Sequence, residues 1–334
     1  MGVFQSKNRF PVKGRTVLIT GGSQGLGRSV ARLLASKGAN IVIVARNVNK
    51  LQEAIAYIAA GATGSETQKF HYISADLTSP ADCIRIFSEV HTWNNNSPPD
   101  IVWCVAGSSH PTLFIDTPMQ SLRDQMDSNY FSSAYTAHAA LRAWLKPKVP
   151  IAPTDKGKVK ETYHLIFTSS VVAFYPIMGY SHYSPTKAAL RSLSDSLSQE
   201  LNLYLEPGLP VPPVRIHTVF PGTILTESYE TEDRMKPEVT KELEKDDPRQ
   251  TPDAVALAAV RSLEKGDELV TTNWLGWAMM CSTLAASKRN GWGVLDTVGA
   301  WIVVSVMGFV RWFMDGTVKN WGRKHGSSGN RKAH

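Results

Sequence analysis

The stretch TGGSQGLG, residues 20–27, decides the fold because it places several glycines directly between a predicted strand and a predicted helix. Residues 16–20 form a short apolar run typical of a buried strand, and residues 25–37 follow a helical pattern. Glycines let backbone N–H groups approach an anionic ligand closely, and the N-terminus of a helix supplies partial positive charge. The stretch therefore predicts a site for the pyrophosphate of a dinucleotide.

The same alternation of strand and helix continues along most of the chain. Continuous apolar strands flanked by helices predict an α/β fold, a doubly wound, Rossmann-type parallel sheet of about seven strands with helices on both faces. We expect this domain to cover residues 14–273, after an N-terminal extension at 1–13. The predicted strands lie at 16–20, 40–46, 70–75, 100–106, 162–169, 214–220 and 268–272. The predicted helices lie at 25–37, 47–60, from about 79, and at 120–145, 181–205 and 251–264, with a polar surface loop at 147–160.

The most informative stretch for chemistry is YSPTK, residues 183–187. Residues four apart share one face of a helix, and an ammonium beside a phenol lowers the pKa of the phenol. A tyrosine tuned in this way can protonate a carbonyl oxygen while hydride reaches the carbon. Ser170 follows the strand predicted at 162–169, where its hydroxyl can hydrogen-bond the same carbonyl. Taken singly, a surface Tyr/Lys pair and a turn serine remain open alternatives.

Together these stretches resemble the short-chain dehydrogenases. The spacing of the glycines is similar to the TGxxxGxG motif of that family rather than to G-x-G-x-x-G, and the serine, tyrosine and lysine resemble its triad. The resemblance implies that Asn129 holds a water that relays protons to the lysine, the alternative being an ordinary helix asparagine. The predicted catalytic group is therefore Ser170, Tyr183, Lys187 and Asn129.

The strand ends predict further contacts with the cofactor. Arg46 ends the second predicted strand, where arginine accommodates the 2′-phosphate of NADP, and Lys50 follows one helical turn later. A solvated helix start is the alternative for this pair. The resemblance also implies an adenine contact from Asp76 and a nicotinamide contact from Thr223, while Cys104 and Val105 depart from the family's pattern. We therefore predict NADPH, bound by Gly21, Ser23, Gln24, Gly25, Leu26, Gly27, Arg46, Lys50, Asp76, Leu77, Ala106, Gly107, Tyr183, Lys187 and Thr223.

The tail at 274–334 differs from the rest of the chain. The run 297–310 is uncharged and strongly apolar but shorter than the roughly 20 residues that span a bilayer. Six tryptophans are scattered along the tail, as expected of interfacial anchors. We expect a membrane-embedded or interfacial hairpin; a buried helix or a homo-oligomer interface is the alternative.

An apolar tail on a chain that resembles a family of carbonyl reductases suits a lipid ketone as the substrate. The resemblance implies reduction of the 3-keto group of 3-ketosphinganine to sphinganine, in sphingolipid synthesis at the endoplasmic reticulum membrane, with the catalytic domain facing the cytosol. The polar segment after residue 223 is then expected to cover the substrate. A steroid, a retinoid or another long-chain ketone remains an alternative substrate, and a catalytically silent NADPH sensor or scaffold is an alternative function.

Composition and charge limit the partners, compartments and metal sites that are expected. The 334 residues are 43% hydrophobic and 19% charged, within the range of globular proteins, and carry a net charge of +7. Without a dense basic stripe carrying interleaved aromatic residues, this charge predicts no nucleic-acid partner. The three cysteines are far apart, so we expect a reducing compartment and no metal site. The N-terminal MGVFQS fits the pattern for myristoylation at Gly2.

Overall fold

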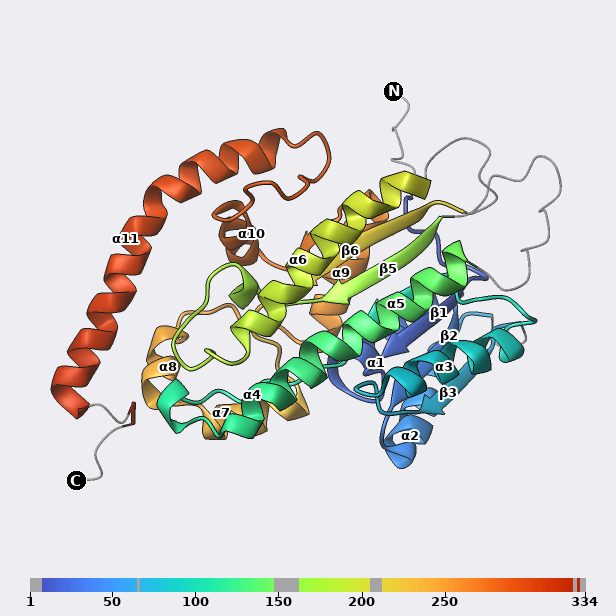
Figure 1. Cartoon of the computed structure of the whole chain (residues 1–334), viewed down its shortest axis with the longest axis horizontal. Helices are drawn as coiled ribbons and strands as arrows, with labels where there is room; N and C mark the ends of the chain where they lie inside the picture. The colour runs from blue at the N-terminus through green and yellow to red at the C-terminus, as the bar shows by residue number, and fades with distance from the viewer. Residues whose placement is uncertain (1–7, 65–66, 147–161, 205–211, 327–328, 331–334) are drawn as a thin grey trace.

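A computed structural model describes residues 8–64, 67–146, 162–204, 212–326 and 329–330. Seven strands form one sheet in the order β3-β2-β1-β4-β5-β6-β7, and every neighbouring pair is parallel. This confirms the predicted doubly wound sheet, drawn in Figure 1. The strands are β1 (Thr16–Thr20), β2 (Asn40–Ala45), β3 (Phe70–Ser74), β4 (Ile101–Cys104), β5 (Tyr163–Thr168), β6 (Val214–Phe220) and β7 (Leu269–Thr271).

Helices cover both faces of the sheet because successive side chains along each strand point to opposite faces. In β1, Val17 and Ile19 join the core beneath α1 (Gly25–Ser36), while Leu18 joins the core on the other face. The first face also carries α2 (Val48–Ala59) and α9 (Pro252–Lys265), and the second carries α3 (Pro80–Trp93), α5 (Ser132–Leu145) and α6 (Ser184–Glu200). The apolar strands are thus buried from two sides, as their sequences predict.

The order of the strands reverses between β1 and β4, which opens a crevice at their carboxyl ends. The Thr20 hydroxyl accepts hydrogen bonds from the backbone N–H groups of Val105 (3.1 Å) and Ala106 (3.3 Å). Because these N–H groups bond a side chain instead of a neighbouring strand, β4 ends at Cys104, two residues earlier than predicted. The crevice is the place where a ligand is expected in such a fold.

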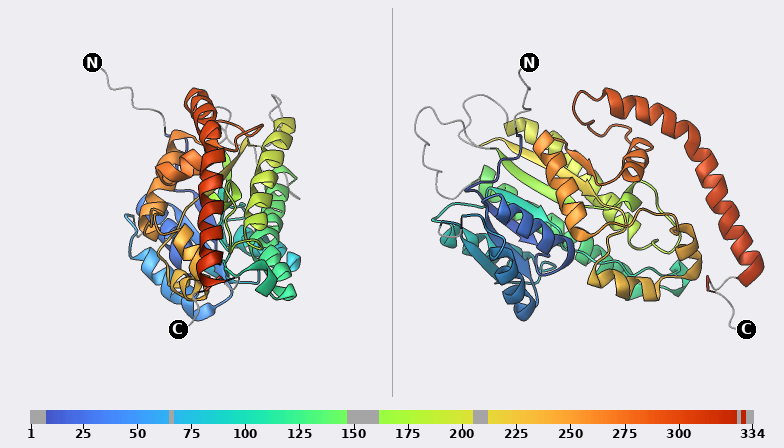
Figure 2. Two further views of the ribbon diagram at one scale, coloured as in Figure 1. Left: turned by 90° about the vertical axis from the view of Figure 1, so that its left-hand side faces the viewer. Right: turned by 180° about the vertical axis from the view of Figure 1, so that it is seen from behind.

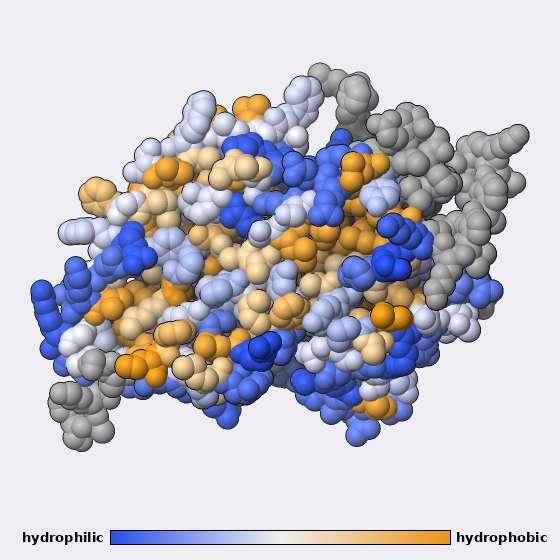
Figure 3. Space-filling model, in the orientation of Figure 1, coloured by the Kyte–Doolittle hydropathy of each residue, from blue (hydrophilic) through white to orange (hydrophobic). Residues whose placement is uncertain are grey.

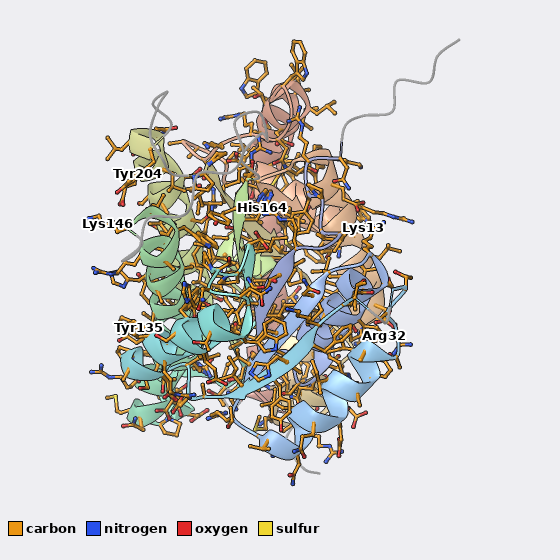
Figure 4. The ribbon with its side chains drawn as sticks, turned by 90° about the vertical axis from the view of Figure 1, so that its right-hand side faces the viewer. Lys13, Arg32, Tyr135, Lys146, His164 and Tyr204 are labelled. Atoms are coloured by element: carbon orange, nitrogen blue, oxygen red, sulfur yellow. The ribbon has the colours of Figure 1, made fainter. Side chains whose placement is uncertain are left out.

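The amino ends of β5 and β6 are closed by buried polar contacts. His164 Nδ1 lies 2.9 Å from His217 Nε2, and His217 Nδ1 lies 2.8 Å from the Asp267 carbonyl oxygen. Burial lowers the pKa of both imidazoles, so both are neutral at pH 7. Figure 4 looks at this side of the molecule and labels His164 in its interior. These histidines serve the fold at the end of the sheet away from the crevice.

The helix predicted at 120–145 contains an interruption. The chain forms α4 (Met119–Met126), a π-helical turn at Asp127–Phe131 and then α5. Hydropathy periodicity cannot detect one wider turn, because the helical rod continues through it. The helix predicted at 181–205 is shorter than expected: α6 covers Ser184–Glu200 and a 3₁₀ turn follows at Leu201–Tyr204.

The tail forms two helices, α10 (Trp274–Cys281) and α11 (Val294–His325). Trp277 Nε1 in α10 donates to the buried Asp296 carboxylate in α11 (3.1 Å), and this hydrogen bond joins the two helices. Gly299 leaves room for the Trp277 ring. The apolar run at 297–310, too short by itself to span a bilayer, is part of a longer helix. The helix has 32 residues and continues past Arg311, whose charge is paired with Asp315 at 2.9 Å. Of the described helices, α11 alone has the length and hydropathy needed to cross a membrane.

Most of α11 lies outside the protein core. Its most apolar 18-residue window is only 11% buried, which contradicts the alternative of a helix buried within this chain. Figure 1 and Figure 2 show it as an arc that stands off the body and returns beside α8 (Glu238–Leu243). In Figure 3 apolar side chains reach the surface along the helix, and hydrophilic ones gather near its C-terminal end. Such a helix suggests association with a membrane. Gly2, in contrast, lies outside the described residues.

Candidate active site

One cavity of about 970 Å³ opens at the carboxyl ends of the strands. Strand β1 leads into its glycine turn, β2 into a basic corner, and β5 and β6 into the side where Tyr183 lies. The residues predicted to contact the cofactor all line it: Gly21, Ser23, Gln24, Gly25, Leu26, Gly27, Arg46, Lys50, Asp76, Leu77, Ala106, Gly107, Tyr183, Lys187 and Thr223. The structure therefore brings these residues from six separate stretches to one site.

The glycine turn fits a wide anionic ligand. A Cβ at Gly21, whose φ is +67°, would lie 2.8 Å from the Ala106 backbone, and a Cβ at Gly27 would overlap the Gly21 carbonyl oxygen. The backbone can therefore turn this tightly only with glycines. Gln24, at the N-cap of α1, makes no capping hydrogen bond, and the first turn of α1 holds no acidic residue. The first N–H groups of α1 thus remain available to phosphate oxygens.

The basic corner lies at the end of β2. Arg46 and Lys50 are exposed and line the cavity, and the Lys50 ammonium donates to Gln24 Oε1 at 2.8 Å. This contact draws the lysine from α2 over to the glycine turn. Asp76 lies further along the wall, where its Oδ1 already accepts from the Thr78 N–H and hydroxyl. Two cations beside the pyrophosphate turn suit an additional phosphate group.

The predicted triad meets on the opposite wall. Tyr183 occupies the N-cap of α6, with Pro185 in the first turn, so Lys187 lies one turn later on the same side. The Lys187 ammonium lies 5.5 Å from the centre of the Tyr183 ring and donates to the Thr168 carbonyl at 3.1 Å. Ser170 follows β5 and hydrogen-bonds with the tyrosine side chain. A phenol, a hydroxyl and an ammonium thus face one space, as a proton donor to a carbonyl requires.

The pKa of Tyr183 corrects one expectation. Burial raises this pKa above its ordinary value, the charge of Glu232 raises it further, and the Ser170 hydrogen bond opposes them. The predicted net lowering of the Tyr183 pKa is wrong for the chain by itself, because burial and Glu232 outweigh the groups that favour the phenolate, and the Lys187 ammonium donates to the Thr168 carbonyl. Burial lowers the pKa of Lys187 itself to about 8. Tyr183 is therefore protonated at neutral pH, the state that a proton donor needs.

Asn129 lies behind the cavity wall, and it does not line the cavity. It sits in the π-helical turn, fully buried, where its Nδ2 donates to the Ser108 carbonyl (2.9 Å) and its Oδ1 accepts from the Ser108 N–H (3.0 Å). A Cβ at Gly107 would fall 2.5 Å from Asn129 Oδ1 and 3.4 Å from Lys187 Nζ. The asparagine and the lysine thus flank Gly107, with the asparagine side chain bonded to the backbone.

Two further parts of the cavity escaped sequence analysis. One is a set of carboxylates, and the other is an apolar wall contributed by α10 and α11. The signals existed in the polar segment after residue 223 and in the apolar tail, but hydropathy alone could not show that both segments return to the strand ends. The carboxylates are Glu232, Glu244 and Asp247, and the apolar wall comprises Leu275, Ala278, Met279, Ile302, Val303, Val306, Met307, Val310 and Met314.

Comparison with known proteins agrees with this geometry. Residues 15–237 match the family model described as short chain dehydrogenase. The chain is 45% identical to a 3-ketodihydrosphingosine reductase of Neurospora crassa, over 98% of this chain and 87% of the relative. It is 47% identical to a 3-ketodihydrosphingosine reductase of Aspergillus fumigatus, over 96% of this chain and 88% of the relative.

Solved structures show the same fold. A short-chain type dehydrogenase/reductase from Mycobacterium ulcerans superposes with a TM-score of 0.63 at 23% identity, covering 78% of this chain and 89% of its own. L-Sorbose reductase from Gluconobacter frateurii, complexed with NADPH and L-sorbose, gives a TM-score of 0.58 at 20% identity and covers 76% of this chain and 91% of its own. At these identities the likeness shows the fold alone.

Proposed function

Because this chain belongs to the short-chain dehydrogenase family, we propose that it reduces 3-ketodihydrosphingosine (3-ketosphinganine) to sphinganine, with NADPH as the cofactor. The observation that carries the proposal is one continuous cavity, which holds the Ser170, Tyr183 and Lys187 group and extends to the apolar wall on α10 and α11. The relatives named for this substrate support it, since they match over nearly the whole chain, tail included.

In the proposed mechanism, Ser170 and Tyr183 bind the keto oxygen of the substrate. A bound nicotinamide nucleotide would supply the hydride. Tyr183 donates its phenolic proton to the oxygen as negative charge develops there, and Ser170 stabilises that charge with a hydrogen bond. Lys187 holds positive charge beside the tyrosine and favours the phenolate left after transfer. Asn129 is proposed as a positioning residue, because it fixes the loop at Ser108 and Gly107 beside the lysine.

We propose NADPH over NADH from the charge at the end of β2. Arg46 and Lys50 lie where the ribose of the adenosine half would be placed by the glycine turn. A 2′-phosphate there gains two cations, whereas a bare 2′-hydroxyl would gain little. Gly21, Gly25 and Gly27 are proposed to admit the pyrophosphate, and Asp76 and Thr223 to contact the adenine and nicotinamide ends.

The apolar wall is proposed to hold the alkyl chain. Residues 302–314 of α11 extend over about 18 Å at about 1.5 Å per residue, comparable with the chain of a long-chain base. At 3.6 residues per turn, Val303, Val310 and Met314 share one side of the helix, while Trp301 and Trp312 share the opposite side. The first side lines the cavity and the second is exposed. Two apolar sides explain why the run shows no amphipathic stripe.

The exposed side of α11 is proposed to contact a membrane. An alkyl chain could then pass from the bilayer to the cavity without entering water. We propose the endoplasmic reticulum membrane, with the catalytic domain in the cytosol, since this is where the resemblance places sphingolipid synthesis.

The proposal is tested with a panel of ketones. Purified full-length protein in detergent or liposomes is given NADPH or NADH, and 3-ketosphinganine is compared with a steroid ketone, retinal and a long-chain ketone. The largest kcat/KM is expected for 3-ketosphinganine with NADPH. A larger value for another carbonyl would assign another lipid substrate, and no turnover of any member would favour a silent nucleotide-binding protein.

A further inference from the structure

The two ends of the cavity carry opposite charge. Arg46 and Lys50 line the nucleotide end together with Asp76, whereas Glu232, Glu244 and Asp247 line the cavity from the segment that follows β6. In the described part of the chain, the only other lysine or arginine in the cavity wall is Lys187. A neutral lipid ketone would bring no positive charge to the cavity side of these three carboxylates, and charged groups lose solvation when a ligand closes a cavity.

The cation that pairs with these carboxylates lies behind them. The Lys236 side chain is 2% exposed, and its ammonium is 2.6 Å from Glu244 Oε2 and 3.6 Å from Glu232 Oε1. Lys236 does not line the cavity, and Arg249, whose charge also acts on Asp247, is exposed outside it. Cations outside the cavity therefore hold these carboxylates in place, and the carboxylates can still accept hydrogen bonds from a ligand in the cavity.

Of the three carboxylates, Glu232 is the one whose charge acts on Tyr183. Its Oε1 accepts a hydrogen bond from the Tyr180 hydroxyl at 2.9 Å, and the rings of Tyr180 and Tyr183 are 5.9 Å apart. Its charge acts on Tyr183 strongly enough to raise the pKa of that phenol. Burial raises the pKa of Glu232 even with Lys236 nearby, so a second cation on the cavity side would further stabilise the ionised carboxylate.

We infer that Glu232 receives the ammonium that 3-ketosphinganine carries on the carbon next to its carbonyl, and so selects long-chain 2-amino ketones over neutral ketones. This rests on the proposed function. The ammonium is carried on the carbon next to the carbonyl, so a carbonyl oxygen bound by Tyr183 and Ser170 places it in the part of the cavity that Tyr180 and Glu232 also line. The alkyl chain then extends toward α10 and α11, so one substrate satisfies the acidic and apolar parts of the cavity together.

The test compares two substrates in three proteins. The substrates are 3-ketosphinganine and its neutral analogue with a hydroxyl in place of the amine; the proteins are wild type, Glu232→Gln and the control Glu230→Gln. Glu230 is an exposed acid on the same helix, α7 (Glu227–Met235), and does not line the cavity. Glu232→Gln should lower kcat/KM for the amine roughly 10- to 100-fold, mainly through KM, the loss expected for one hydrogen bond to a charged group.

The ratio of the two kcat/KM values separates binding of the ammonium from tuning of Tyr183. Removing the Glu232 charge changes the pKa of Tyr183 for both substrates, and that effect cancels in the ratio. Wild type and Glu230→Gln should prefer the amine, whereas Glu232→Gln should lose most of the preference. An unchanged preference in Glu232→Gln overturns the inference.

Other outcomes are also decisive. Wild-type protein that reduces amine and neutral analogue equally well overturns the inference without any variant, even if Glu232→Gln fails to fold. Wild-type protein that reduces neither substrate contradicts the proposed function instead. Glu232→Asp, which keeps the charge, should retain the preference for the amine.

Discussion

At the scale of single residues, the cavity separates the task of binding the nucleotide from the task of moving a proton. Tyr183 is protonated because burial and Glu232 both raise its pKa, while Lys187 loses part of its affinity for protons by being buried. The two groups are a helical turn apart, and both titrate above neutral pH, but burial reverses their ordinary order because the pKa of Lys187 falls below that of Tyr183. In this environment Tyr183 can donate a proton, and Lys187 beside it changes its charge near pH 8.

The pH dependence of reduction should report Lys187. Its pKa lies near 8, below its ordinary value of 10.5, so the ammonium is charged below pH 8 and lost above it. We expect kcat/KM for the ketone to be flat at pH 6–7 and to fall toward tenfold per pH unit above about 8, because the charge is needed beside the phenolate. Initial rates from pH 6 to 10, with nucleotide binding measured in parallel, check this; a flat profile to pH 10 contradicts it.

Cofactor choice should depend on Arg46. Arg46→Asp places a carboxylate at the end of β2, where it repels a 2′-phosphate and accepts from a 2′-hydroxyl. The preference for NADPH over NADH should fall by at least roughly tenfold, the effect of one charge-assisted hydrogen bond. Arg28→Asp is the control: Arg28 stacks near Tyr57 and does not line the cavity. An unchanged preference in Arg46→Asp would reject this assignment.

The meeting of the predicted residues at one cavity could be inferred from the sequence, because their patterns are local. The glycine turn and YSPTK each carry their spacing within eight residues, and strand ends bring them together. The side-chain environment could not be predicted: the direction of the Tyr183 pKa depends on Glu232, 49 residues away, and on the Lys187 bond to a backbone carbonyl. Contacts between residues so far apart in the chain leave no periodic pattern in the sequence.

At the scale of elements, the turn between β1 and α1 sets how closely two strands and a ligand approach. Gly21 faces the Ala106 backbone, and Gly27 faces the carbonyl of Gly21. The bounds of the strands β1 and β6 are the same as predicted, whereas the π-helical turn at 127–131 was missed, since apolar spacing on either side of it is helical.

Substitution of Gly27 tests this turn. A Cβ in Gly27→Ala overlaps a backbone oxygen that cannot move without opening the turn, which costs about 1–3 kcal/mol. We expect a lower melting temperature and NADPH binding weaker by at least roughly tenfold. In Gly316→Ala the new methyl meets nothing within 4 Å, so NADPH affinity should be unchanged. Equal NADPH affinity in Gly27→Ala and wild type, measured by fluorescence titration, would show that the turn does not form the site.

At the scale of the whole molecule, α11 relates the cavity to its surroundings. One side of the helix closes the cavity and the other presents large aromatic side chains, including Trp301 and Trp312, each 72% exposed. Sequence analysis recognised the apolar tail but not its return over the strand ends, because contacts between α11 and α8 join segments more than 50 residues apart. The boundary of the folded domain at 273 remains a prediction.

Membrane binding should depend on the exposed side of α11. Replacing Trp301, Phe309, Trp312 and Phe313 by serine removes apolar surface without touching residues of the cavity wall. We expect most of the protein to leave liposomes in a flotation assay, because burying each such ring contributes about 1.5–3 kcal/mol. Reduction of a short, water-soluble 2-amino ketone should continue at the wild-type rate. Full retention on liposomes would place the membrane contact elsewhere.

The most direct measurement is the oxidation of NADPH by purified full-length protein in liposomes containing 3-ketosphinganine, with sphinganine identified as the product. The wild-type protein should form one sphinganine for each NADPH consumed. Tyr183→Phe should lose roughly 10²- to 10⁴-fold in kcat while binding NADPH as tightly as before. Turnover in Tyr183→Phe equal to that of the wild type, or no sphinganine from the wild-type protein, would contradict the account.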